Sequence, residues 1–347
     1  MPGDRVAVSG VDAWRPADGR ATIVDVAAAA GVSRQTVTRA MNDMPGISPR
    51  TKARVLAAAQ ELQYRPSRFG RGLVKPSQRT LGLLVTDLTN PYYPELASAV
   101  IGAAAERGWS VVLAEEKHAT DHRRQVRELA GQVDALVGYV GAEHPGRGED
   151  TDERLGVPLV QVDVEPHQTD HGGVVFSPRL GVEQAIEHLA GFGVRRPVMI
   201  DSAGPDLPSR RGRLFVDGWA ARGVDALWIP AGDATVTTGV SGLERALGER
   251  PDLDAVLAFN DVMALGVLSA LRGHGIGVPD QVRVIGVDGL SLGELANPRL
   301  TTIAIDLAVV ARLAVELAVG MDGGTVPRSG PGARRSVSYQ LHVRESA

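Results

Sequence analysis

Residues 22–42 of this 347-residue chain read TIVDVAAAAGVSRQTVTRAMN, and this stretch decides the fold of the N-terminal part. Thr22 can cap a first helix that ends at Gly31, a residue suited to a left-handed turn, and Ser33 can cap a second helix that ends near Met41. The apolar residues that would pack these helices together are Val26, Ala27, Ala30, Val32, Val37 and Ala40. The spacing therefore predicts a helix-turn-helix.

The second of these helices keeps a polar face free. Its outward-facing residues are Arg34, Gln35, Thr36 and Arg39. Arginine can hydrogen-bond guanine with two donors and glutamine can pair with adenine in the same way, so this face has the chemistry of major-groove readout. The alternative is a three-helix bundle with a charged surface and no DNA partner.

Charge is distributed unevenly along the chain. Residues 20–79 contain eleven Lys and Arg against three acidic residues, a net of +8, whereas the whole chain carries −4, so the remainder carries −12. This asymmetry is typical of a polyanion-binding head on an acidic body, although a merely solvated basic surface is the alternative. No apolar run approaches the ~18 residues needed to cross a bilayer. With no cysteine and no secretion signal, we expect a cytoplasmic protein.

Three further segments precede the larger part of the chain. Residues 1–20 are rich in Gly, Pro and Asp and are expected to form a flexible tail. Ser48, followed by proline, can cap a third helix that ends near Tyr64 and completes a headpiece over residues 21–65. The apolar face of that helix is predicted to contain Val55, Leu56, Ala59 and Leu62. Residues 66–77 are a basic, proline-bounded linker.

Residues 78–347 alternate strand-like and helix-like patterns, which predicts two doubly wound lobes built on parallel sheets. We assign residues 78–176 and 304–327 to one lobe, and residues 177–303 and 333–347 to the other. The predicted strands are 81–85, 110–114, 135–139, 159–162, 197–200, 255–259, 282–287 and 336–343. The predicted helices are 93–107, 123–132, 181–192, 213–221, 239–247, 262–272 and 307–319.

The stretch over residues 22–42 resembles the headpiece signature of the LacI/GalR family nearly position by position. The resemblance spans residues 21–346 and includes ISPRT at 47–51, LQYRP at 62–66, LGLLV at 81–85 and NPYY at 90–93. It implies a transcription regulator, usually a repressor, that binds two-fold operator DNA as a homodimer. Its fold would be an all-α helix-turn-helix headpiece joined to an α/β, two-lobed periplasmic-binding-protein-like domain that senses a small polar effector such as a sugar. No catalytic residue, metal or cofactor is expected.

The resemblance assigns roles to residues of the headpiece. Arg34, Gln35 and Arg39 fall on the base-reading positions, while Thr22, Ser33 and Asn42 would position the second helix on phosphates. Thr36, on the same outward face of the second helix, is also expected to contact DNA.

The linker resembles the hinge helix of the family, which folds on operator DNA. Leu73 occupies the position of the leucine that wedges into the minor groove, and Arg71 is expected to contact DNA beside it. The alternative for Leu73 is packing on the core. Gly70 and Gly72 stand where alanine and a polar residue are usual, and each costs ~1 kcal/mol of helix propensity relative to alanine.

The family binds its effector between the lobes, at the carboxyl ends of strands. Five residues are expected there: Asp87, Tyr93, Asp163, Asn260 and Asp288. Asn260 is also a candidate cap for the following helix.

One departure concerns the arginine that the family places a fixed step before a Gly-aromatic pair. This chain has Phe215 at that step, ahead of Gly218 and Trp219. We take Arg213 as the substitute, with Arg211 also nearby.

Two other classes of protein compete with this interpretation. Residues 289–293 read GLSLG and match the G-x-S-x-G pattern of hydrolases, but only His342 follows, and no strand-to-helix elbow is predicted. An exported solute-binding protein would share the two-lobed fold, yet it would lack the basic helical head.

Overall fold

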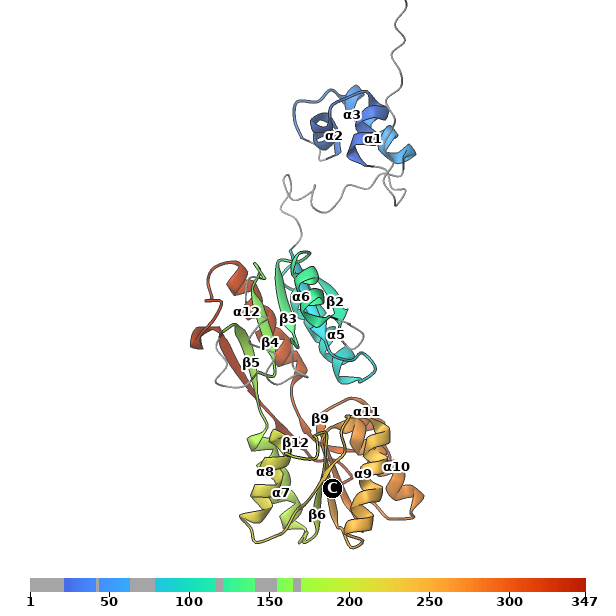
Figure 1. Cartoon of the computed structure of the whole chain (residues 1–347), viewed down its shortest axis with the longest axis vertical. Coiled ribbons are helices and arrows are strands. Elements are labelled where there is room, and N and C mark those ends of the chain that lie inside the picture. Colours follow the sequence, from blue (N-terminus) through green and yellow to red (C-terminus); the bar gives the residue numbers. More distant parts are fainter. Residues whose placement is uncertain (1–21, 42–43, 63–78, 117–120, 141–154, 165–169) are drawn as a thin grey trace, which may run out of the picture. The chain divides into compact units, whose positions relative to one another are not determined.

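The computed structural model describes residues 22–41, 44–62, 79–116, 121–140, 155–164 and 170–347. The chain divides into two units, Met1–Gln78 and Arg79–Ala347 (Figure 1). The predicted tail and linker, and with them Asn42, Arg71 and Leu73, lie outside the described residues.

The first unit contains the predicted helix-turn-helix and the third helix. Helix α1 covers Ile23–Ala30, α2 covers Arg34–Met41 and α3 covers Pro49–Glu61. Thr22 forms a capping box at the start of α1, because its hydroxyl accepts from the backbone of the third helical residue, whose carboxylate accepts in return. Gly31 ends α1 with φ of 60°, a conformation that glycine adopts without steric cost.

The core of this unit confirms most of the predicted packing. Its buried residues are Val26, Ala27, Ala30, Val37, Ala40, Val55, Ala58 and Ala59. Val32 and Leu62 are partly buried against them. The prediction for Leu56 was wrong: its side chain is 42% exposed, and Ala58 is buried in its place. Positions 55, 58, 59 and 62 share one helical face, whereas position 56 is rotated about 100° away from position 55.

The second unit contains two six-stranded sheets, each with helices on its faces (Figure 1). The sheet of the first lobe has the order β11-β5-β4-β3-β1-β2, and all its pairings are parallel. Its strands are β1 (Thr80–Val85), β2 (Ser110–Glu115), β3 (Ala135–Gly138), β4 (Leu159–Val162), β5 (Gly172–Ser177) and β11 (Arg334–Ser338).

The sheet of the second lobe has the order β12-β10-β9-β8-β6-β7, and only the pairing of β12 with β10 is antiparallel. Its strands are β6 (Pro197–Asp201), β7 (Leu227–Pro230), β8 (Ala255–Ala258), β9 (Arg283–Asp288), β10 (Thr301–Ala304) and β12 (Gln340–His342).

At most of their ends, the helices of the structure extend a few residues beyond the predicted bounds. The first lobe has α5 (Tyr92–Ala105), α6 (His122–Ala130) and α12 (Leu307–Asp322), and the second has α7 (Arg179–Gly191), α8 (Arg210–Ala220), α9 (Val236–Glu249), α10 (Asp261–Gly273) and α11 (Leu292–Leu295). Helices α5 and α12 share a core with Leu81 and Leu83, while α6 packs with Leu84 and Leu136. Because successive strand residues point to opposite faces, these helices cover the two faces of the sheet.

The chain crosses between the lobes three times: between β5 and α7, between β10 and α12, and at Tyr339 between β11 and β12. The prediction of one closing strand over residues 336–343 was therefore wrong. Residues 334–338 pair with β5 in the first lobe, so their assignment to the second lobe is corrected.

Three strands, β5, β7 and β10, were not predicted from the sequence. Strand β10 contains Thr301 and Thr302, which are both fully buried although they are polar. The hydroxyl of Thr302 donates to Asp261, and that of Thr301 accepts from the backbone of Arg344. Hydrogen bonds to distant residues satisfy these groups, and the local hydropathy pattern carries no trace of such bonds.

Candidate functional sites

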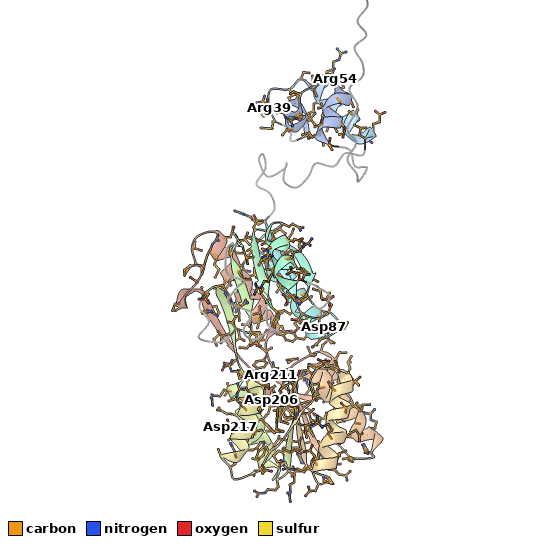
Figure 2. The ribbon with its side chains drawn as sticks, in the orientation of Figure 1. Arg39, Arg54, Asp87, Asp206, Arg211 and Asp217 are labelled. Atoms are coloured by element: carbon orange, nitrogen blue, oxygen red, sulfur yellow. The ribbon has the colours of Figure 1, made fainter. Side chains whose placement is uncertain are left out.

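The exposed face of α2 is the first candidate site. The side chains of Arg34, Gln35 and Arg39 are exposed, and within the described residues no hydrogen bond or ion pair engages those of Arg34 and Gln35. Figure 2 shows Arg39 at the surface of the three-helix unit, with Arg54 of α3 elsewhere on that surface. The side chains of α2 that are predicted to read bases are therefore available to a partner.

Two of the predicted phosphate contacts also fold the unit. The hydroxyl of Ser33 accepts from the backbone N–H of Thr36 at 3.1 Å and lies 3.0 Å from the Thr36 hydroxyl, so Ser33 caps α2. Thr22 caps α1 in the same manner. These hydroxyls fix where each helix begins, and hence where the first-turn N–H groups are presented.

The second candidate site surrounds Arg211, in the first turn of α8. One guanidinium nitrogen donates to the carbonyl of Phe259 at 2.8 Å, and another donates to the hydroxyl of Tyr339 at 2.8 Å. That second nitrogen also lies 3.6 Å from a carboxylate oxygen of Asp288, and the guanidinium stacks over the rings of Phe259 and Tyr339. Arg211 thus joins the end of β8, the end of β9 and the crossing segment between β11 and β12.

The first lobe contributes tyrosines to the same region. The hydroxyls of Tyr92 and Tyr139 lie 2.8 Å apart, and the ring of Tyr93 packs edge-on against both rings. Burial raises the pKa values of Tyr92 and Tyr139 well above the ordinary value, and the charge of Asp163 raises both further. These tyrosines are therefore neutral hydroxyls that can donate as well as accept.

Of the predicted effector residues, Arg213 is not in this cluster. It is exposed, and its guanidinium donates to the carbonyl of Pro208 at 2.7 Å. The sequence-based start of the helix at residue 213 was three residues late, because Ser209 caps α8 and Arg211 falls in its first turn. Arg211 is thus the arginine that meets Asp288. Figure 2 shows it at the end of the second lobe that faces the first.

The other predicted residues lie where their strands end. Asp163 follows β4 with φ of 58° and is exposed, and its charge raises the pKa of Arg211. Asn260 is 2% exposed and caps α10 through Met263. Asp87 follows β1, at the end of the first lobe that faces the second (Figure 2), and its carboxylate accepts from Thr89. The sequence analysis did not assign a site role to Tyr92, Tyr139, Phe259 or Tyr339; Tyr92 lies in the NPYY stretch, and the other three lie in no motif that was identified.

Burial raises the pKa values of two carboxyl groups in the second lobe. Burial raises the pKa of Asp288 to about 8, against the opposing charge of Arg211 and with support from Asp261, Asp163 and Glu95. Burial also raises the pKa of Asp261 to about 6, although hydrogen bonds from Thr302 and two backbone amides lower it.

We expect the stability of the second unit to fall as the pH rises from about 4 to about 8. Both pKa values are raised from 3.8, so the folded state binds more protons than the unfolded state across that window. The charged groups that face Asp288 are Arg211, Asp261, Asp163 and Glu95. Replacing Asp288 with asparagine should flatten the upper half of this dependence. The measurement is the unfolding midpoint against pH for both proteins, and parallel curves would contradict the assignment.

A three-helix unit with a free polar face, followed in the sequence by a two-lobed α/β unit with a buried polar site, defines the class of ligand-sensing DNA-binding regulators. Residues 22–67 match the bacterial regulatory proteins of the lacI family, and residues 186–347 match the periplasmic binding protein-like domain. The ribose operon repressor of Escherichia coli (strain K12) is 33% identical over 309 residues, which cover 86% of this chain and 92% of the repressor. The chain belongs to the lacI family and is a transcriptional regulator.

Solved structures agree with this assignment. The LacI family transcriptional regulator from Arthrobacter sp. FB24, in complex with lactose, is 36% identical with a TM-score of 0.72, covering 78% of this chain and 100% of that one. The lac repressor dimer bound to operator and the anti-inducer ONPF is 26% identical with a TM-score of 0.69, covering 94% and 99%. Among the described helices of the present chain, none is long and apolar enough to cross a membrane.

Proposed function

We propose that this regulator is a repressor that reads its operator with α2. A sugar that binds beside Arg211 and Asp288 would lower or raise its affinity for that operator. The observation that carries the DNA-binding half is the exposed pair Arg34 and Gln35 on a helix capped by Ser33. Such a helix can enter the major groove with its first turns against base edges. The regulator would act in the cytoplasm, where the operator is.

Alanine substitution tests this assignment. Arg34→Ala and Gln35→Ala should each lose about 1–3 kcal/mol of affinity for the cognate operator and little for random DNA, because bidentate base contacts are specific to sequence. Arg54→Ala on α3 is the matched control and should weaken both DNAs similarly, since a phosphate contact does not distinguish bases. Fluorescence-anisotropy titrations at fixed salt measure all three. Equal losses on both DNAs for Arg34→Ala would remove α2 from base reading.

The proposed effector is a sugar bound between the two lobes. Carboxylates, a guanidinium and tyrosine hydroxyls provide both acceptors and donors for sugar hydroxyls, and the Phe259 and Tyr339 rings add apolar surface. A relative at 36% identity was solved with lactose. A thermal-shift screen with ribose, lactose and cellobiose tests the class, because a ligand at 100 times its dissociation constant adds ~2.7 kcal/mol.

A homodimer fits the exposed apolar side chains of the second unit. Leu295 is 82% exposed, Ile101 is 50% exposed and Leu113 is 40% exposed. They lie on α11, α5 and the edge strand β2, which run along the same side of this unit in Figure 1. A second copy related by two-fold symmetry would cover them and would match a two-fold operator.

We propose no catalytic role for the G-x-S-x-G pattern. The hydroxyl of Ser291 donates to the carboxylate of Glu95 at 2.6 Å, and the four-residue helix α11 follows it in place of the long helix of a nucleophile elbow.

A further inference from the structure

The turn that follows β9 presents three consecutive backbone N–H groups to carboxylates. The N–H groups of Gly289 and Leu290 donate to one oxygen of Asp261, at 2.9 and 2.7 Å. The N–H of Ser291 donates to Glu95 at 3.2 Å, and the Ser291 hydroxyl donates to the same Glu95 oxygen at 2.6 Å. Four donors of this turn therefore form hydrogen bonds with two carboxylates.

These two carboxylates belong to different lobes. Asp261 begins α10 in the second lobe and is fully buried, in a space that Gly286 leaves open: a Cβ there would lie 2.2 Å from the carboxylate. Glu95 lies in the first turn of α5 in the first lobe. The turn over residues 289–291 is thus held from its own lobe by Asp261 and from the opposite lobe by Glu95.

The residue that precedes the turn needs such support. Asp288 has φ of 114° and is 6% exposed, and its neighbour Gly289 has φ of 83°. A non-glycine residue at that φ is strained and persists where its surroundings fix it. Hydrogen bonds to charged acceptors are about twice as strong as neutral ones, which suits them to this task.

We propose that Glu95 is a positioning residue of the effector site: by accepting both donors of Ser291 it holds, across the two lobes, the turn that aims Asp288 at Arg211. This inference rests on the proposed function, because that proposal makes the region around Asp288 the effector site. The contact between Glu95 and Ser291 does not depend on it. It also gives the serine of the G-x-S-x-G pattern a role, which is to tie its lobe to α5. Effector binding at Asp288 and the relative placement of the lobes would then be coupled through one turn.

The first experiment needs no ligand. The natural chain contains no cysteine, so Arg127→Cys on α6 and Asp217→Cys on α8, both exposed, accept one spin label in each lobe of the full-length protein. Glu95→Ala and Ser291→Ala should broaden the distance distribution between the labels. Glu95→Gln should restore most of the narrow distribution, because its amide oxygen still accepts from Ser291. The control Glu294→Ala, which loses an ion pair with Arg344 within the second lobe, should leave it unchanged.

The second experiment measures lactose binding by calorimetry. Glu95→Ala should weaken it about tenfold while the unfolding midpoint stays within a degree or two of wild type, and Glu95→Gln should recover most of the affinity. If wild type does not bind lactose, that choice of effector fails, and the label distances alone decide on Glu95. A distance distribution that is the same in wild type and Glu95→Ala overturns the inference, as does unchanged lactose affinity in Glu95→Ala when wild type binds.

Discussion

Replacing Arg211 with alanine is expected to weaken binding of the effector sugar by about 100-fold, or ~2.7 kcal/mol. The substitution removes charge-assisted donors and leaves the buried carboxyl of Asp288 without the guanidinium 3.6 Å away. It also releases the Tyr339 hydroxyl on the segment that crosses between the lobes. Operator affinity without effector should stay within a few-fold, because the proposed DNA contacts lie in the headpiece and not at Arg211. Calorimetry with the sugar that most stabilises the wild type measures the first effect, and operator titration measures the second.

The matched control is Arg213→Ala, two residues further along α8. Arg213 is exposed and bonds only to a carbonyl of its own loop among the contacts described, so its loss should change sugar affinity less than twofold. Arg211→Lys should recover little, since a lysine cannot reproduce two donors at fixed angles. The opposite ranking, with Arg213→Ala the damaging variant, would support the assignment made from the sequence.

Replacing Asp261 with alanine should destabilise the second unit by about 3–5 kcal/mol. Two donors lose their acceptor at a fully buried position: the backbone N–H of Leu290, and the hydroxyl of Thr302 at 2.6 Å. The N–H of Gly289 keeps only its longer bond of 3.2 Å to the Thr302 hydroxyl oxygen. Each buried donor without a partner costs about 1–3 kcal/mol. Urea unfolding followed by tryptophan fluorescence provides the measurement.

The asparagine variant separates hydrogen bonding from volume. Asp261→Asn keeps one oxygen for the two backbone donors and turns its amide toward Thr302, whose hydroxyl oxygen can accept, so it should lose only about 1 kcal/mol. Asp217→Ala, at an exposed position on α8, should stay within about 0.5 kcal/mol of wild type. If alanine and asparagine at position 261 cost the same, the carboxylate does not hold the turn.

The headpiece could be predicted from the sequence almost completely. Caps at Thr22 and Ser33, the glycine at position 31 and the period of the apolar residues act over a few residues, so the sequence displays them directly. The error at Leu56 was a single step of helical phase, and the three consecutive alanines that follow it in α3 leave that phase poorly marked.

The candidate effector site could be predicted only in part. Asp163, Asn260 and Asp288 could be predicted as candidates because the carboxyl ends of parallel strands gather at one edge of a sheet. Tyr339 was not, because it lies in a crossing segment whose hydrogen-bonding pattern matches neither sheet alone. The choice between Arg211 and Arg213 depended on where α8 begins, and helix ends are the least certain part of any sequence-based assignment.

By itself the sequence determined the class of each unit, the exposed polar face of α2 and the alternation that builds two parallel sheets, because all of these depend on residues within one or two turns of each other. The tertiary structure alone decided which arginine contacts Asp288 and which carboxylates bind the turn at Gly289–Ser291. It also decided after which strands the chain crosses from one lobe to the other. Glu95 and Ser291 are 196 residues apart in the chain and become partners only when two lobes have folded. Contacts of that kind follow from how whole elements pack, and no local pattern records them.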